Sequence, residues 1–213
     1  MAGCVTTVEL DRELKEAGVK DSKLILPAKR SFLFDFVKEK VIDYEIIVVS
    51  PDEIDAALNN PDLNLNKLEA LTSAKIIKAL VERNPGVKIE VMLDSPTNTP
   101  APYIAYVEGL VKNPDVIIKA ETKADMNYIS VGSGSILAKV TRDELIDKME
   151  LDAKSIIGSD EIGSGYPSDP KTKLFVAKYW DKLDSVKGGF FRKTWKTYTN
   201  VVKAKAQTGL GRY

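Results

Sequence analysis

The chain has 213 residues, of which 44% are hydrophobic and 29% charged, as expected of one globular domain or one domain with an appendage. It contains no histidine, which excludes Ser-His-Asp and Cys-His catalysis and leaves carboxylates as the natural ligands of a hard divalent cation. The single cysteine, Cys4, excludes an intramolecular disulfide and indicates a reducing cytosol, so we expect a cytoplasmic protein. No apolar run is long enough to span a bilayer and no signal segment follows Met1, so we expect no membrane association.

The first half of the chain alternates predicted strands and helices. A short strand is predicted over residues 5–10, followed after Pro27 by a helix with Phe32, Leu33, Phe36 and Val37 at helical spacing. The β-branched run 43–50 predicts a buried strand, and 51–62 predicts a short helix and a loop. Residues 64–83 predict the longest clear helix, on which one apolar stripe is formed by Leu68, Leu71, Ala74, Ile77 and Val81.

The alternation continues through the second half. Strands are predicted over 88–94 and 115–120, with a short helix over 105–111 between them. Further helices are predicted over 135–150, 172–183 and 194–206, with a glycine-rich turn over 163–170. This order indicates an α/β layered domain. Asp94 ends one of the strands, at the edge where open α/β sheets usually bind their ligands.

The stretch 123–143 combines an acid with small and basic residues. Asp125 follows an apolar strand, and the small residues 132–135 are predicted to form a turn that opens a helix bearing Lys139 and Arg142. Free backbone N–H groups and the helix dipole make such a turn an anion site, so a cation and a phosphate can be held side by side. This is the chemistry of phosphodiesters. Alternatively, Ser135 is only an N-cap, the two glycines form a tight turn, and the basic residues are a solvated face.

Charge is distributed unevenly, although the net charge is zero. Residues 171–213 contain eleven Lys or Arg and two acids, whereas residues 1–170 contain 20 basic and 29 acidic residues. Aromatic side chains are interspersed with the basic ones: Tyr179, Trp180, Phe190, Phe191, Trp195 and Tyr198. A basic, aromatic end is typical of nucleic-acid binders, although a solvated helix face explains the lysines equally well.

Seven short motifs span nearly the whole chain. They are DSK at 21–23, NLNKLE at 64–69, LDSP at 93–96, KAD at 123–125, SILAKVTRD at 135–143, EIGSGYPSDP at 161–170 and TWKT at 194–197. Together, and in this order, they resemble the ribonuclease HII (type 2 ribonuclease H) family, most closely its archaeal and eukaryotic branch. The run SILAKVTRD followed by GSGYPSDP is specific, unlike a single short motif.

The resemblance implies a ribonuclease H-like mixed central sheet flanked by helices, with a helical C-terminal extension. Residues 1–170 are then the catalytic core and 171–213 the basic extension. The implied activity is that of a hydrolase, an endonuclease that cuts RNA in RNA–DNA hybrids and at ribonucleotides embedded in duplex DNA, as in DNA replication and repair. Four carboxylates hold Mg²⁺ or Mn²⁺ in the family, and Asp94 and Asp125 match two of them. We expect a monomer.

The resemblance also implies substrate-binding residues. Tyr166 matches the family tyrosine that packs on the sugar beside the cut, although a rigid Gly-Tyr-Pro turn explains it as well. Contacts to the phosphates or the backbone of the nucleic acid are implied for Lys23, Asn66, Ser135 and Arg142. Sequence-independent backbone binding is a further possibility for Arg192, Lys193 and Lys196.

The chain departs from the family pattern in two places. The family's first strand carries Gly-x-Asp-Glu-Ala-Gly-Arg-Gly, which supplies the other two carboxylates and should precede a strand matching residues 2–5. Here the sequence starts at Met1, and the similar run 158–165 already has its own place in the family. The second departure is Gly-Ser-Gly-Ser at 132–135 in place of Ser-Ala-Ala-Ser, where each glycine costs a helix roughly 1 kcal/mol against alanine.

We therefore expect cleavage by this chain to be weak or absent, and to be rescued when the motif-bearing strand is restored. Four explanations are open: an internal recorded start, a fragment, a paralogue that binds nucleic acid without cleaving it, or a shift of residues 1–10 into the gap. Loss of a central strand would leave ladder groups of its neighbours unpaired, which favours the first two.

Overall fold

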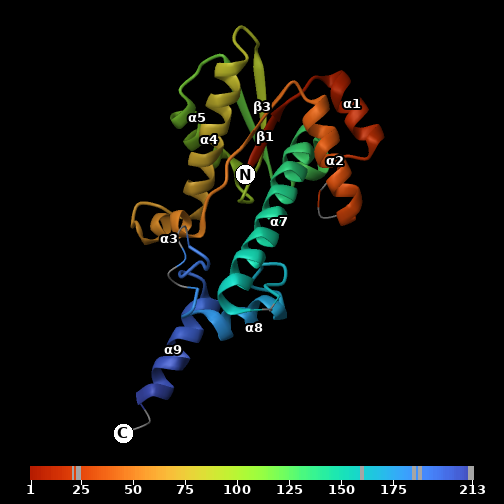
Figure 1. Cartoon of the computed structure of the whole chain (residues 1–213). Helices are drawn as coiled ribbons and strands as arrows, with labels where there is room; N and C mark the ends of the chain where they lie inside the picture. Colours follow the sequence, from red (N-terminus) through yellow and green to blue (C-terminus); the bar gives the residue numbers. More distant parts are fainter. Residues whose placement is uncertain (21, 23–24, 159–160, 184–185, 187–188, 211–213) are drawn as a thin grey trace. The chain divides into compact units, whose positions relative to one another are not determined.

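The computed structural model describes residues 1–20, 22, 25–158, 161–183, 186 and 189–210 (Figure 1). Contacts within the chain divide it into two compact units. Unit 1 comprises Met1–Val48 and Asn66–Thr141, and unit 2 comprises Val49–Leu65 and Arg142–Tyr213. The division predicted from the sequence, a catalytic core at 1–170 and a basic extension at 171–213, stays a prediction.

The strands of unit 1 form two pairs. β1 (Ala2–Val5) runs antiparallel to β2 (Asp43–Ile46), and β3 (Ile89–Asp94) runs parallel to β4 (Val116–Glu121). Helix α5 (Pro100–Val111) makes the crossover that a parallel pair requires. The predicted α/β class is confirmed. In the described part of the chain the strands pair as two two-stranded sheets.

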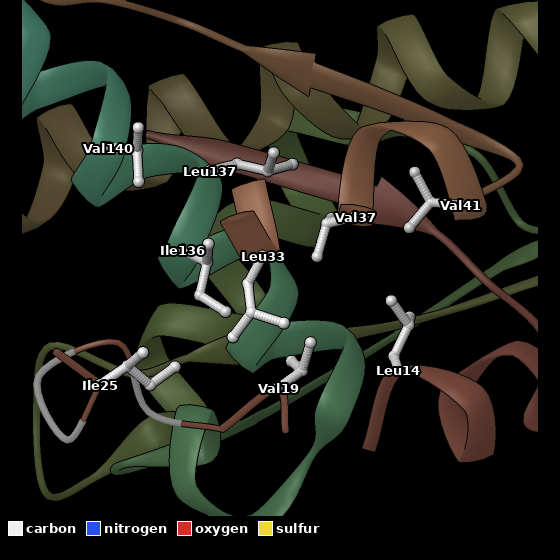
Figure 2. Packing of buried hydrophobic residues seen from close by; sticks show 9 residues of the cluster. All are labelled: Leu14, Val19, Ile25, Leu33, Val37, Val41, Ile136, Leu137 and Val140. Carbon is white, nitrogen blue, oxygen red and sulfur yellow. The ribbon is translucent and has the colours of Figure 1, made fainter. Parts of the chain in front are cut away.

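Helices cover the two sheets from opposite sides in unit 1 (Figure 1). Side chains from α1 (Val8–Ala17), α2 (Pro27–Lys40) and the first part of α7 (Ile129–Ile157) pack with partly buried residues of β1 and β2. The buried members of this cluster, shown in Figure 2, are Leu14, Val19, Ile25, Leu33, Val37, Val41, Ile136, Leu137 and Val140. A second cluster joins α4 (Leu65–Arg83) and α5 to β3 and β4.

The predicted strand over 5–10 is wrong. β1 ends at Val5, and α1 begins at Val8 because the Thr7 side chain accepts a hydrogen bond from the Leu10 N–H at 3.3 Å. At its other end Gly18, with φ 101°, donates its N–H to the last carbonyls of the helix. The segment is therefore helical. Its capping residues, Thr7 and Gly18, indicate a helix more clearly than its hydrophobic pattern does.

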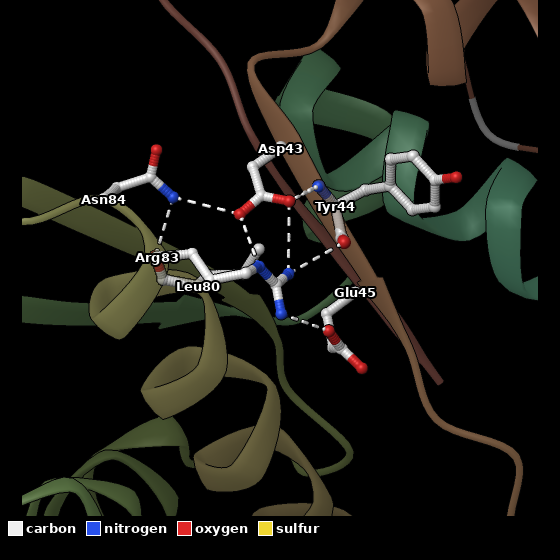
Figure 3. Close-up of polar contacts among 6 residues, drawn as sticks. All are labelled: Asp43, Tyr44, Glu45, Leu80, Arg83 and Asn84. Atoms are coloured by element: carbon white, nitrogen blue, oxygen red, sulfur yellow. Dashed lines mark hydrogen bonds and ion pairs between the residues drawn. The ribbon is translucent and has the colours of Figure 1, made fainter.

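Arg83, at the end of α4, connects that helix to β2 (Figure 3). Its Nε donates to Asp43 at 2.9 Å and its Nη1 to Glu45 at 2.7 Å. Its Nη2 reaches the Tyr44 carbonyl at 3.0 Å, and the Asn84 amide donates to Asp43 at 3.1 Å. Since α4 also packs on β3 and β4, this cluster fastens one helix to both sheets of unit 1.

Replacing Arg83 by glutamine should destabilise the chain by about 1 kcal/mol at neutral pH, because solvent screens a guanidinium that is 43% exposed. The hydrogen bond from Arg83 is the main cause that lowers the pKa of Asp43 below its ordinary 3.8. A carboxyl with a lowered pKa stabilises the fold above the unfolded pKa and loses that contribution as pH falls through the folded pKa. The loss caused by Arg83→Gln should therefore shrink below pH 3.8.

Urea unfolding at a series of pH values measures this difference. The matched control is Lys40→Gln, which removes the 3.7 Å pair between Lys40 and Glu13 on the surface of unit 1. It should cost less than about 0.5 kcal/mol. Equal losses for both variants, or a loss for Arg83→Gln that persists in acid, would contradict the prediction.

Unit 2 is helical and rich in aromatic side chains. It contains α3 (Pro51–Asn59), the second part of α7, α8 (Pro170–Tyr179) and α9 (Lys196–Leu210). Asp55, 7% exposed, accepts hydrogen bonds from the N–H of Lys193 and from the N–H and hydroxyl of Thr194, which fastens α3 to the start of α9. The buried core of the unit is Ala153, Ile162, Phe175, Val176, Tyr179, Leu183, Phe190, Phe191 and Tyr198. Within the described ranges, no helix is both long and apolar enough to cross a membrane.

Candidate active site

A groove of about 1000 Å³ lies within unit 1, bordered by β1, β3, α4, α6 (Ala124–Asn127) and the start of α7. Its lining includes the two predicted acids, Asp94 and Asp125, together with Ser135. Asp94 reaches it as the last residue of β3, and Asp125 from the helix that follows β4. The groove runs along β3, and one end of it lies at the carboxyl ends of the parallel strands β3 and β4, the usual place of ligand sites in open α/β sheets.

A backbone hydrogen bond places the Asp94 carboxylate beside Ala124, the residue before Asp125. Asp94 Oδ1 accepts from the backbone N–H of Ala124 at 3.0 Å, so its carboxylate lies one residue away from Asp125. Lys123, with φ 61° in the left-handed region, turns the chain between β4 and α6 and aims this N–H at Asp94. Asp94 is exposed, whereas Asp125 is 6% exposed. The structure brings the two acids together, and their role as metal ligands stays a prediction.

A third carboxylate, Glu69 of α4, lines the same groove and was missed as a site residue. Burial raises the pKa of Glu69 above its ordinary 4.5, and the negative charge of Asp94 raises it further. Burial is also the main cause of the raised pKa of Tyr103, whose hydroxyl lies 3.2 Å from that of Ser73. Glu69 is the last residue of the motif at 64–69, and it stands four residues before Ser73 on the same helix face.

The carboxylate oxygens that line this groove are suitable ligands for a divalent cation, but there are too few of them to complete its coordination sphere. Carboxylate oxygens are the ligands that Mg²⁺ and Mn²⁺ prefer, and such ions take about six ligands. Within the described part of the chain, however, no group of three or more His, Cys, Asp or Glu residues is arranged to hold a metal. As metal ligands, which is their predicted role, Asp94 and Asp125 would supply only part of such a coordination sphere.

The predicted turn at 132–135 is wrong, because these residues lie inside α7, which begins at Ile129. Both glycines serve close packing instead of a turn. A Cβ on Gly134 would lie 3.0 Å from the Ala2 carbonyl, and one on Gly132 would lie 3.4 Å from backbone atoms of Lys20 and Asp125. The helix can thus approach β1 and α6 closely, which offsets the helix propensity that glycine loses. Ser135 is not an N-cap, and the predicted anion site at a helix start is absent from this segment.

The sequence predicts three further substrate-binding residues in the first 141 residues, namely Lys23, Asn66 and Ser135. The hydroxyl of Ser135 is 2.8 Å from that of Ser22, which is 3% exposed. Asn66 is exposed on the first turn of α4. Lys23 falls outside the described residues. For these three the sequence prediction of a phosphate or backbone contact stays a prediction.

Arg142 and Tyr166 contact each other within unit 2. The guanidinium carbon of Arg142 lies 3.8 Å from the centre of the Tyr166 ring, and Nη2 donates to the Ser164 carbonyl at 2.9 Å. Gly165, with φ 69°, permits this approach, since a Cβ there would lie 2.7 Å from Ile146. The glycine turn is therefore held against α7, and Tyr166 is 42% exposed.

Comparison with known proteins gives one consistent result. A family model described as Ribonuclease HII matches residues 1–198. A ribonuclease HII of Methanococcus maripaludis strain C7 is 36% identical over 191 residues, covering 90% of this chain and 75% of the relative. That of Pyrococcus furiosus is 37% identical over 208 residues, covering 94% and 86%.

Solved structures of ribonucleases H are similar to this chain in fold. Ribonuclease H2 from Pyrococcus horikoshii superposes with a TM-score of 0.76 at 30% identity, covering 95% of this chain and 88% of the other. The RNase HII of Archaeoglobus fulgidus, solved in complex with PCNA, gives 0.72 at 28% identity, covering 94% and 86%. Bst-RNase HIII, solved in complex with Mn²⁺, gives 0.71 at 15% identity, covering 93% and 62%, and this similarity supports the fold alone.

Proposed function

This chain belongs to the ribonuclease HII family, and we propose on that premise that it cuts RNA in RNA–DNA hybrids and at single ribonucleotides in duplex DNA. Membership makes the chain a ribonuclease H, a phosphodiester hydrolase of a family that depends on divalent metals. The observation that supports the site is the hydrogen bond that holds the Asp94 carboxylate beside Asp125 in one groove.

In this proposal Asp94 and Asp125 supply oxygen ligands to Mg²⁺ or Mn²⁺. When bound, such a cation polarises a phosphate and lowers the pKa of water at the site. The Ala124 N–H fixes the orientation of Asp94. The low exposure of Asp125 limits competition from bulk water and strengthens its charge interactions.

Recognition of the ribonucleotide is assigned to unit 2. The exposed Tyr166 ring offers an apolar surface for a sugar, and discrimination between ribose and deoxyribose must act through the 2′-hydroxyl or the sugar conformation. Arg142, stacked on this ring, adds a positive charge for a phosphate. Sequence-independent contacts to the nucleic-acid backbone are proposed for Arg192, Lys193 and Lys196.

The cytoplasmic location remains part of the proposal. Its support is the lone thiol of Cys4, which donates to the Ser130 carbonyl at 3.4 Å and whose pKa is raised by burial to about 12. A thiol that stays protonated is a poor nucleophile, as expected of a structural cysteine in a reducing compartment. Size-exclusion chromatography tests the prediction that the chain is a monomer.

The test uses a labelled DNA duplex that contains one ribonucleotide, with the chain in excess so that slow cleavage is visible. We expect a single cut at the ribonucleotide in Mg²⁺ or Mn²⁺, its loss when a chelator removes the cation, and no cut in the all-DNA duplex. Cleavage of both duplexes alike, or cleavage that survives the chelator, would overturn the proposal.

A second function is favoured by the incomplete set of carboxylates in the described residues. In that case the chain is a non-catalytic module that binds hybrids through its basic C-terminal residues. It would bind the same duplex with an affinity that falls steeply with salt, and would cut it in neither metal. Binding of this kind that is unchanged by Asp94→Asn, with no cleavage by either chain, would select this alternative.

A further inference from the structure

We propose that Thr172 positions Tyr166, and that its hydroxyl thereby determines how well the chain distinguishes a ribonucleotide from a deoxyribonucleotide. The inference rests on the role proposed above for Tyr166, whose ring packs on the sugar. Thr172 is only 3% exposed, so it is a positioning residue that acts through the turn carrying the tyrosine and not through contact with the nucleic acid.

The turn before Tyr166 is held in place largely by side chains. Residues 162–165 belong to no helix or strand, and Gly163 and Gly165 both have left-handed backbone, with φ 77° and 69°. Three N–H groups of the turn donate to side chains of α7 and of the start of α8. These hydrogen bonds run from Ile162 to Glu150 at 3.2 Å, from Ser164 to Asp169 at 2.7 Å and from Gly165 to Thr172 at 3.0 Å.

Thr172 binds both ends of this turn. Its hydroxyl donates to the Ile162 carbonyl at 2.9 Å and accepts the N–H of Gly165 at 3.0 Å. A single hydroxyl can do this because it has one donor and two acceptor lone pairs. Packing around the turn is tight, since a Cβ on Gly163 would lie 3.2 Å from the backbone nitrogen of Thr172. Loss of the hydroxyl should therefore displace the turn, and with it Tyr166, the next residue.

Helix α8 does not depend on the Thr172 hydroxyl for its cap. Asp169 is the N-cap, and its carboxylate accepts the N–H of Lys171 at 2.9 Å. The hydrogen bond from Ser164 is the main cause that lowers the pKa of Asp169 below its ordinary 3.8, so this cap stays ionised at neutral pH. The two hydrogen bonds of the Thr172 hydroxyl lead to the turn, which indicates that the hydroxyl serves the turn and not the helix.

The tyrosine ring depends on the same turn through Arg142. The guanidinium that stacks on the ring at 3.8 Å also donates to the Ser164 carbonyl at 2.9 Å. A displaced turn would therefore change both the backbone of Tyr166 and the stacking partner of its ring. Misplacement of a substrate-positioning group by about 1 Å can cost about 100-fold in rate, so a small shift of this ring is enough to affect cleavage.

The test compares two substitutions of Thr172 in cleavage of a duplex with one ribonucleotide, in Mg²⁺ and with the chain in excess. Thr172→Val keeps the shape of the side chain and removes both hydrogen bonds, and it should cut at least about tenfold more slowly. Thr172→Ser keeps the hydroxyl and should stay within about threefold of the wild type. The matched control is Thr72→Val, because Thr72 is 4% exposed and its hydroxyl donates at 2.9 Å to the Leu68 carbonyl within α4. It should leave the rate unchanged.

A double-mutant cycle separates positioning from a merely structural role. In a Tyr166→Ala chain, Thr172→Val should change the rate by less than about twofold, because the residue through which it acts is gone. The full loss in that chain, or an equal loss in Thr172→Ser, would overturn the inference. A wild-type rate in Thr172→Val or in Tyr166→Ala would overturn it as well and would leave the nuclease proposal intact.

Binding decides the inference if the wild-type chain does not cut, a result that counts against the nuclease proposal alone. Fluorescence anisotropy in Mg²⁺ then compares the affinities for the duplex with one ribonucleotide and for the all-DNA duplex. A preference for the ribonucleotide that is lost in Thr172→Val and Tyr166→Ala, and kept in Thr172→Ser, supports the positioning role. No preference in the wild type, or a preference that Thr172→Val leaves unchanged, overturns it.

Discussion

Asp94→Asn should lower the rate of ribonucleotide cleavage by about 100-fold or more, because a metal ligand acts on charge that develops in the transition state. The affinity for the duplex should change by less than about threefold, since the contacts proposed for binding lie elsewhere. Asparagine keeps an oxygen that can accept the Ala124 N–H, so the fold around α6 should persist. Single-turnover cleavage with the chain in excess separates the rate from the affinity.

A control and an independent readout make this prediction specific. Asp115→Asn removes an exposed acid that precedes β4, at the opposite end of the strand from Asp125, and it should leave cleavage unchanged. Because Asp94 is one cause of the raised pKa of Glu69, Asp94→Asn should also lower that pKa, measurable by carbon NMR of the carboxyl. Equal cleavage losses in both variants, or an unchanged Glu69, would show that Asp94 does not act in this groove.

The proximity of Asp94 and Asp125 can be predicted from the sequence, because each acid follows a strand and the two strands are parallel neighbours. Both residues come after apolar, β-branched runs, and parallel strands present their carboxyl ends at one edge. The fold class followed from the same alternation of strands and helices. Glu69 was harder to find, since its approach to Asp94 depends on how α4 packs across the sheet, which local pattern does not specify.

The turn predicted at 132–135 is wrong for a physical reason that the local sequence does not contain. Glycine has a low helix propensity, so two glycines close together indicate a turn. In the structure Gly132 and Gly134 lie inside α7 and allow close contacts with Lys20 and Ala2, which are distant in sequence. Such long-range packing cannot be predicted from a local window of residues.

Leu137→Ala should lower the free energy of unfolding by about 3–4 kcal/mol, the cost of a cavity at a fully buried leucine. Leu137 is 0% exposed and packs against α1, α2 and β1 in the cluster of Figure 2. Its neighbours include Leu33 and Val37, which cannot fill the space without leaving their own contacts. Leu151→Ala is the matched control, because it makes the same change on the same helix at a side chain that is 66% exposed. It should stay within about 0.5 kcal/mol.

The measurement must follow unit 1, where Leu137 lies, separately from unit 2. Both tryptophans, Trp180 and Trp195, belong to unit 2, so their fluorescence reports unit 2 alone. Hydrogen exchange read peptide by peptide in α1 and α2 reports the core around Leu137, and protection there should fall by about two orders of magnitude, since each 1.4 kcal/mol is tenfold. A drop of less than tenfold would mean that α7 is not the centre of this core. A drop that appears equally in tryptophan fluorescence would mean that the two units unfold as one.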